Sequence, residues 1–201
     1  MRIVAGKFRG KNLAKSDHLK LLRPTTDKNR EALFNILASA KFVKEINFKI
    51  EGAKVLDVCC GSGAVGFEAL SRGAASISFI DNNLQHLELV KKNAALLQVE
   101  NEIKIFCADV KNLPQKPNAI FRQAQDNNEF FDLIFIDPPY AEDYKTIIEN
   151  LLQKNWLKKD SLIVIEFQTN SRLKNFLLND FTMLDSRSYG KTSFVFLTYL
   201  T

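Results

Sequence analysis

From residue 53 onward, short apolar segments alternate with amphipathic ones, and this alternation constrains the fold more than any other feature of the sequence. Each apolar segment has the length of a buried strand, and the segments between them carry apolar residues at helical spacing. Apolar strands that alternate with helices indicate a parallel sheet covered on both faces. The predicted parallel strands are residues 53–58, 75–80, 103–108, 131–136 and 162–167.

The two ends of the chain differ from this pattern. Residues 181–187 and 192–199 flank Ser188-Tyr189-Gly190-Lys191 and predict an antiparallel hairpin at the sheet edge. The sequence therefore predicts an open, Rossmann-like α/β sheet of about seven strands whose last strand is antiparallel. Residues 1–12 predict a short β-hairpin. We expect one domain over residues 1–201, with a basic arm at 1–22 and the Rossmann-like core at 23–201.

Positive charge gathers at the amino-terminal end. Residues 1–50 hold twelve Lys or Arg and four acids, a balance of +8, so the rest of the chain carries −3 of the net +5. A basic arm on a mildly acidic body is typical of proteins that bind nucleic acid, although a merely solvated face gives the same pattern. We expect Lys7, Arg9 and Lys11 to contact RNA phosphates.

Several classes of protein are disfavoured. The first residues have no apolar core of a secretory signal, and no stretch approaches the length of a membrane span. Three cysteines without a CxxC pair or a histidine cluster indicate neither a disulfide framework nor a zinc site. We expect a monomeric cytoplasmic protein with no membrane partner and no metal.

A glycine-rich loop follows the first predicted parallel strand. Gly61, Gly63 and Gly66 have GxGxxG spacing and open a predicted helix. Glycines at these positions allow a tight turn and a close approach of backbone to ligand, and the helix amino terminus offers free N–H groups. This combination predicts a nucleotide site at the carboxyl ends of the strands.

Acidic residues around the loop indicate which nucleotide binds. Asp57 precedes the glycines and would repel a pyrophosphate, but it suits the ammonium and sulfonium charges of S-adenosylmethionine. Asp81, at the end of the next strand, is placed to accept hydrogen bonds from ribose. Asp109, after the third strand, is placed near the adenine amino group, although a turn or cap role fits it too.

The fourth strand runs directly into Asp137-Pro138-Pro139-Tyr140. The lone pair of an exocyclic amine is delocalised into its ring, and acceptors on the amine hydrogens localise it for methyl transfer. Asp137 and the Pro138 carbonyl offer such acceptors, and the two prolines stiffen the loop. Tyr140 offers a surface for a flipped-out base. The alternative is a strand ended by a Pro-Pro turn, with Tyr140 covering the core.

Five segments together resemble the RsmD family of class I methyltransferases: MRIVAGKFRGKNL, RPTTDKNREALFNIL, VLDVCCGSGAVGFEALSRGA, FIDPPY and YGKT. The resemblance implies methylation of guanine N2 in 16S ribosomal RNA with S-adenosylmethionine as donor. It implies a catalytic loop of Asp137, Pro138, Pro139 and Tyr140, a cofactor site of Asp57, Gly61, Ser62, Gly63, Asp81 and Asp109, and substrate contacts near the active-site mouth from Arg23, Thr25, Thr26 and Arg30.

The chain departs from the family pattern at two places. Cys59-Cys60 stand where Phe-Ala or similar is common, and Asp81 stands where Glu is usual. We expect the first change to alter packing beneath the loop and the second to shorten the reach to ribose. The cysteines lie away from the acceptor loop, so we expect buried thiols and no nucleophile.

Three other functions remain open at this point. An adenine-N6 methyltransferase would use the same acceptor loop, and only the amino-terminal RPTTD segment favours guanine. A nicotinamide-dependent oxidoreductase is disfavoured by Asp57, and a non-catalytic RNA-binding module is disfavoured by Asp137. The sequence does not distinguish free 16S RNA from an assembled 30S particle as the substrate.

Overall fold

A seven-stranded sheet forms the centre of the computed structural model, which describes residues 1–15, 25–115, 130–138, 144–169 and 180–199. The predicted strands are confirmed, with ends that differ by one or two residues. The strands are β1 Lys54–Val58, β2 Ser76–Asp81, β3 Ile103–Cys107, β4 Leu133–Ile136, β5 Leu162–Gln168, β6 Phe181–Tyr189 and β7 Thr192–Tyr199.

The strand order is β3-β2-β1-β4-β5-β7-β6. Strands β1 to β5 are parallel to one another, whereas β7 runs antiparallel to both β5 and β6. The predicted mixed sheet with an antiparallel end is therefore confirmed. Chain order reverses between β1 and β4, and such a switch point is where open α/β sheets bind ligands.

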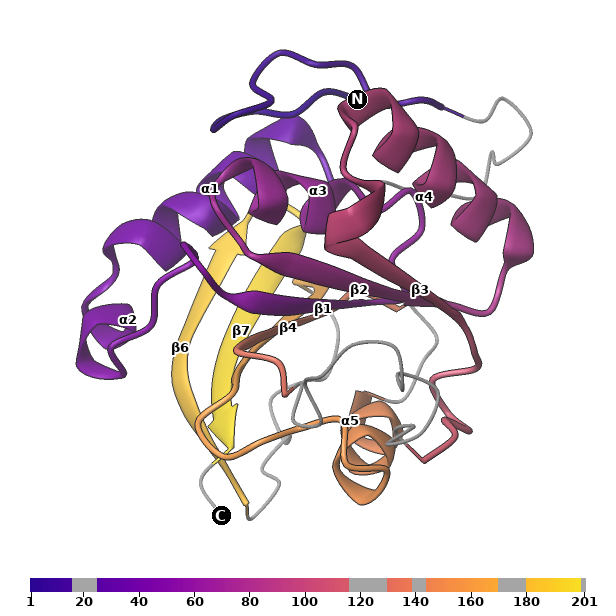
Figure 1. Ribbon diagram of the computed structural model, residues 1–201. Coiled ribbons are helices and arrows are strands. Elements are labelled where there is room, and N and C mark those ends of the chain that lie inside the picture. The colour runs from indigo at the N-terminus through magenta and orange to yellow at the C-terminus, as the bar shows by residue number, and fades with distance from the viewer. Residues whose placement is uncertain (16–24, 116–129, 139–143, 170–179, 200–201) are drawn as a thin grey trace.

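Helices cover both faces of the sheet, as Figure 1 shows, with α1, α3 and α4 on one side and α5 on the other. Side chains alternate along β1, so Val55 packs under the first group of helices and Leu56 packs toward α5. The helices are α1 Asp27–Ser39, α2 Lys41–Glu45, α3 Ala64–Ser71, α4 Leu84–Leu97 and α5 Tyr144–Gln153, and a 3₁₀ turn, η1, spans Glu100–Glu102. No helix among the described residues is long and apolar enough to cross a membrane.

Helix α1 begins where its sequence predicts. The Thr26 hydroxyl accepts a hydrogen bond from the Asn29 backbone N–H at 3.1 Å, and Asp27 lies in the first turn. Both features satisfy or complement the free N–H groups of a helix start. Phe34 of this helix packs against Phe135 of β4 at a tilted angle, with ring centroids 5.8 Å apart, so the helix is held against that strand.

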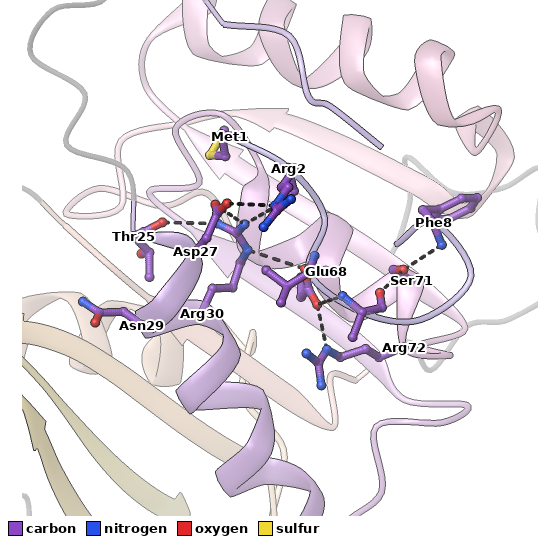
Figure 2. Close-up of polar contacts among 12 residues, drawn as sticks. Met1, Arg2, Phe8, Thr25, Asp27, Asn29, Arg30, Glu68, Ser71 and Arg72 are labelled. Carbon is purple, nitrogen blue, oxygen red and sulfur yellow. Dashed lines mark hydrogen bonds and ion pairs between the residues drawn. The ribbon is translucent and has the colours of Figure 1, made fainter. Parts of the chain in front are cut away.

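The expected amino-terminal hairpin is reduced to a loop closed by one antiparallel bridge, between Arg2 and Asn12. Figure 2 shows that this loop lies against α3. Glu68 of α3 accepts the backbone N–H groups of Val4 and Ala5, at 2.8 and 3.0 Å, and Ser71 accepts that of Phe8 at 2.9 Å. The loop is therefore fixed by side chains of the helix that follows the glycine loop.

Candidate active site

A cavity of about 360 Å³ opens at the carboxyl ends of β1, β2, β4 and β5. Parallel strands place the residues that follow them at one edge of the sheet, so chain segments far apart in sequence meet here. The cavity walls contain the residues predicted for cofactor and catalysis together with others. Its polar lining includes Thr25, Asp57, Ser62, Asp81, Asn82, His86, Asp109, Asp137 and Glu166.

Two glycines shape the loop between β1 and α3. Gly63 has a left-handed φ of +74° and ends the turn before α3, and a Cβ there would lie 2.8 Å from the Phe67 ring. A Cβ on Gly66 would lie 2.4 Å from Phe79, so only glycine lets α3 approach β2 this closely. Packing against Phe67 and Phe79 therefore requires glycine at both positions.

Asp57 lies buried beneath the loop, where its Oδ2 accepts the Gly66 N–H at 3.0 Å. The pKa of Asp57 is raised to about 8, mainly because burial removes water from the carboxylate; the hydrogen bond from Gly66 opposes this rise, and the nearby charge of Asp81 adds to it. A buried acid with a raised pKa is stabilised in its charged form when a cation binds beside it. Asp57 therefore fits the positive charges predicted for the ligand.

Asp81 is held from three sides at the end of β2. Gly61 N–H donates to Oδ2 and Asn83 N–H donates to Oδ1, both at 2.9 Å, and His86 Nδ1 lies 3.1 Å from Oδ2. The short aspartate thus joins the glycine loop to the start of α4. His86 is a residue that the sequence analysis did not single out, and its side chain lines the cavity beside Asp81. Its position in the first turn of the helix that follows β2 is the sequence feature that could have indicated this.

The other predicted cofactor residues also lie at the cavity. Asp109 lines the wall while its Oδ1 accepts the Lys111 N–H at 3.0 Å, so the turn role and the ligand role are compatible. Ser62 is buried, and its carbonyl accepts a hydrogen bond from Asn93 Nδ2 at 3.1 Å. Cys60 is buried as expected, and burial raises the pKa of its thiol well above the usual value. Cys107 is exposed, which corrects the expectation of buried thiols.

Asp137 follows β4 and faces the same cavity. Its backbone N–H donates to the Val58 carbonyl at 3.3 Å, so it lies directly beside the end of β1. Ile136 pairs with Ile165, and the next residues on the two strands are Asp137 and Glu166. The Thr25 hydroxyl, just before α1, donates to Glu166 Oε2 at 2.7 Å. Two carboxyl groups and one hydroxyl from three segments therefore meet at one wall.

The pKa of Asp137 is raised well above its usual value. Burial is the largest cause, followed by repulsion from Glu166 and from Asp57, while a hydrogen bond with Thr25 acts in the opposite direction. Like charges at close range disfavour simultaneous ionisation, so the neighbouring acids favour the protonated form of Asp137. The acid pair can thus change its proton content when ligands bind.

The structure divides the remaining candidates. Pro138 is buried and lines the cavity, and Thr25 also lines it. Pro139, Tyr140 and Arg23 lie outside the described residues. Thr26 is exposed and caps α1. Lys7, Arg9 and Lys11 are exposed on the amino-terminal loop and do not line the cavity, and Lys7 lies at the far end of α3, where its N–H donates to the Ser71 carbonyl at 2.7 Å.

The expectation that Arg30 contacts RNA is wrong. Its side chain is fully buried and contacts Asp27 at 2.9 Å, Glu68 at 3.5 Å and the Thr25 carbonyl at 3.2 Å (Figure 2). The guanidinium therefore holds the segment before α1 against α3, and it has no surface to offer a phosphate. Helical spacing alone did not reveal this, because a long cation on a helix is usually exposed.

Glu166 is the main residue that sequence patterns missed. It lies near the end of the apolar strand LIVIEFQ, and an acid at that place in a buried strand was the signal. Asp57 and Asp137 occupy similar places in or just after their own strands. Because adjacent parallel strands keep the same facing, the three acids share one face of the sheet.

An acid-lined cavity below a glycine loop fits S-adenosylmethionine better than a dinucleotide. Asp57, Asp81 and Asp137 disfavour a pyrophosphate, and repulsion between neighbouring acids contributes to the raised pKa values of Asp57 and Asp137. A ligand with an ammonium and a sulfonium group would place positive charge beside these acids. Asp57 and Asp81 would hold that ligand's charged and ribose portions, and Asp109 would lie at its base.

A sequence profile of the family described as Conserved hypothetical protein 95 matches residues 1–198. Ribosomal RNA small subunit methyltransferase D of Haemophilus influenzae is 33% identical over 195 residues, which cover 96% of this chain and 91% of that protein. The protein of the same name from Escherichia coli K12 is 36% identical over 174 residues, covering 86% and 77%.

Solved structures give the same picture. A putative methyltransferase, yhhF, from Escherichia coli superposes with a TM-score of 0.77 and 27% identity, covering 100% of this chain and 98% of that one. TrmN from Thermus thermophilus superposes with a TM-score of 0.62 at 20% identity, over 86% of this chain and 48% of that one. The second likeness concerns the fold alone.

Proposed function

This chain belongs to the family described as Conserved hypothetical protein 95, the RsmD family, and we propose that it methylates the exocyclic N2 amine of a guanine in 16S ribosomal RNA with S-adenosylmethionine as donor. The relatives named small subunit methyltransferase D support an rRNA methyltransferase activity. One observation carries the proposal: Asp137 follows β4 directly beside β1, next to the cavity that Asp57 and the glycine loop line. The expected positions of the methyl-accepting amine and of the methyl donor are therefore adjacent.

Each acid has its own task in this proposal. When bound, S-adenosylmethionine supplies an electrophilic methyl group. Asp57 balances positive charge, and Asp81 orients the ribose from its fixed place beside Gly61. Asp137 and the Pro138 carbonyl accept the two hydrogens of the amine, which turns the nitrogen lone pair toward the methyl.

The proton balance of the reaction involves the acid pair. The amine nitrogen would form a bond to the methyl carbon as the carbon–sulfur bond of the donor breaks and S-adenosylhomocysteine leaves, and the positively charged amine would then lose one proton. Asp137 lies beside the amine in this proposal, and its ionised form, which a cationic donor favours, would accept that proton.

The basic amino-terminal loop would contact the RNA substrate outside the cavity. Lys7, Arg9 and Lys11 are exposed on a loop that Glu68 and Ser71 hold in place, so their charges are presented to RNA phosphates from a fixed surface. Whether the substrate is naked 16S RNA or a 30S particle is decided by the experiment. The protein acts in this proposal as a cytoplasmic monomer.

Transfer of radioactive label tests the proposal. The purified protein is incubated with S-[methyl-³H]adenosylmethionine and with naked 16S RNA, 30S particles, 23S RNA or DNA. We expect label in 16S RNA or 30S particles that are prepared from cells lacking the modification, and none in 23S RNA or DNA. Label in DNA alone would instead support the adenine-N6 alternative, and absence of transfer to every substrate would refute the proposal.

A further inference from the structure

Glu166 adds a second acidic acceptor to the wall where the amine binds. It follows Ile165 on β5 just as Asp137 follows Ile136 on β4, and those isoleucines are register partners. Parallel strands lie about 4.8 Å apart, so the two side chains start from neighbouring points and face the same way. Both line the cavity, and repulsion between them contributes to the raised pKa of Asp137. The loop after β4 therefore does not act alone.

Thr25 sets the direction of this second acceptor. Its hydroxyl donates to Glu166 Oε2 at 2.7 Å, and Arg30 Nη1 fixes the Thr25 backbone by a bond to its carbonyl at 3.2 Å. A carboxylate offers about four acceptor positions, so a hydrogen bond from Thr25 is compatible with a further donor from a bound base. Glu166 is thus held as an acceptor at the cavity wall.

Guanine and adenine differ in what they offer to such a pair. The edge of guanine that carries N2 also carries N1–H, so two neighbouring ring positions donate hydrogen. The edge of adenine that carries the N6 amine has a bare N1, which is itself an acceptor. A flipped-out base is read by hydrogen bonds to this edge. Two adjacent carboxyl groups are complementary to guanine, whereas adenine N1 would face the lone pairs of one of them.

We propose that Glu166 is the residue that selects guanine, by accepting the N1–H of the target base while Asp137 and Pro138 accept the N2 amine hydrogens. Thr25 is a positioning residue that holds Glu166 in this role. The proposal rests on the proposed function, since it assumes that the amine binds at Asp137. This role would explain why the segment Thr25-Thr26-Asp27 lies beside the cavity. Thr25 is 141 positions from Glu166 in the sequence, yet it bonds to that side chain.

A base analogue that keeps the N2 amine but lacks N1–H tests the role of Glu166. The target guanosine, located first by mapping the wild-type product, is replaced by 2-aminopurine riboside in ligated 16S RNA, which is then assembled into 30S particles. This base keeps the N2 amine but has a bare N1. 2-Aminopurine also lacks O6, so a control for that loss is needed. 6-Thioguanosine serves as this control, because it keeps N1–H and weakens the acceptor at position 6.

The wild-type protein should methylate 2-aminopurine about 10- to 100-fold more slowly than guanine, because one buried hydrogen bond is lost and an acceptor is left facing a carboxylate. The 6-thioguanosine substrate should react within about threefold of guanosine. In Glu166→Gln the amide can donate to the bare N1, so the guanine-to-aminopurine ratio should fall toward one. Thr25→Val should lower the same ratio, and Thr25→Ser, which keeps the hydroxyl, should preserve it.

Glu149→Gln is the matched control, because Glu149 lies on α5 in an exposed ion pair with Lys145 at 3.7 Å. It should leave the ratio unchanged. Equal loss of both reactions in Glu166→Gln, with unchanged affinity for S-adenosylmethionine, would overturn the role in selection, as would an unchanged ratio. If the wild-type protein fails to form N2-methylguanosine at all, the proposed function itself fails, so the two failures are distinguishable.

Discussion

Arg30 and Glu68 form a fully buried ion pair, with Arg30 Nε 3.5 Å from Glu68 Oε2. Arg30 Nε makes no hydrogen bond to any described residue, so it meets Glu68 as a charge and not as a donor. Glu68 also accepts Arg72 Nε at 2.8 Å and two backbone N–H groups of the amino-terminal loop. One carboxylate therefore joins the loop, α1 and α3 (Figure 2).

Removal of this carboxylate should destabilise the protein strongly. Glu68→Ala removes the buried anion that faces Arg30 Nε and leaves two N–H groups without an acceptor, and we expect a loss of about 3–5 kcal/mol in the free energy of unfolding. Urea denaturation followed by circular dichroism measures it. Glu88→Ala, which breaks the exposed pair with Lys91, should cost less than about 1 kcal/mol. Equal losses in the two variants would contradict the structural role of Glu68.

Binding of S-adenosylmethionine should release protons through Asp57. The pKa of Asp57 is raised to about 8 in the folded protein, so at pH 7 most molecules carry this proton. A cation beside the carboxylate lowers that pKa, and the proton leaves. Calorimetry at pH 7 in phosphate and in Tris buffer should therefore give different binding enthalpies. Asp57→Asn keeps an acceptor for the Gly66 N–H and should abolish the difference. Identical enthalpies for the wild-type protein would contradict the assignment.

The same shift links Asp57 to stability in the unliganded protein. Because the folded pKa lies above the usual value of 3.8, the stabilisation of the protonated acid is complete below pH 3.8 and is lost as the pH rises through about 8. The unfolding free energy of the wild-type protein, relative to that of Asp57→Asn, should thus fall between pH 5 and pH 9. A difference between the two proteins that stays constant over this range would show that Asp57 titrates normally.

Asp137 should serve chemistry more than cofactor binding. Asp137→Ala removes an acceptor from the amine, and we expect a loss of about 100-fold or more in kcat. Affinity for S-adenosylmethionine should remain within about threefold. Asp137→Asn keeps an acceptor oxygen and should retain more activity than the alanine variant. Single-turnover rates and calorimetry give the two quantities, and loss of cofactor binding in Asp137→Ala would refute this division of tasks.

The basic loop should contribute affinity that depends on salt. Replacing Lys7, Arg9 and Lys11 with Ala should weaken RNA binding and reduce the slope of log K against log salt by about 2, because each lost phosphate contact contributes about 0.7 on a single strand. Replacing the exposed Lys41, Lys44 and Lys49 removes the same charge from another surface and serves as the control. An equal change in both variants would mean that only net charge matters.

Much of the fold and of the site was predictable from sequence. The spacing of apolar residues indicates strands and helices, and the residues that follow each strand indicate the site. Strands, the glycine loop and the placement of Asp57, Asp81 and Asp137 at one cavity follow from a parallel sheet, in which all carboxyl ends meet. Long-range pairing was not predictable. The bond from Thr25 to Glu166 joins residues 141 positions apart, and the burial of Arg30 depends on Glu68 of another helix. No local pattern encodes either contact.

The identity of the methylated nucleoside tests the central claim most directly. Unmodified 30S particles or 16S RNA are incubated with the protein and labelled S-adenosylmethionine, the RNA is digested, and the nucleosides are separated by chromatography with mass spectrometry. The arrangement of Asp137 and Glu166 predicts that the label is found in N2-methylguanosine. Label in N6-methyladenosine would contradict it.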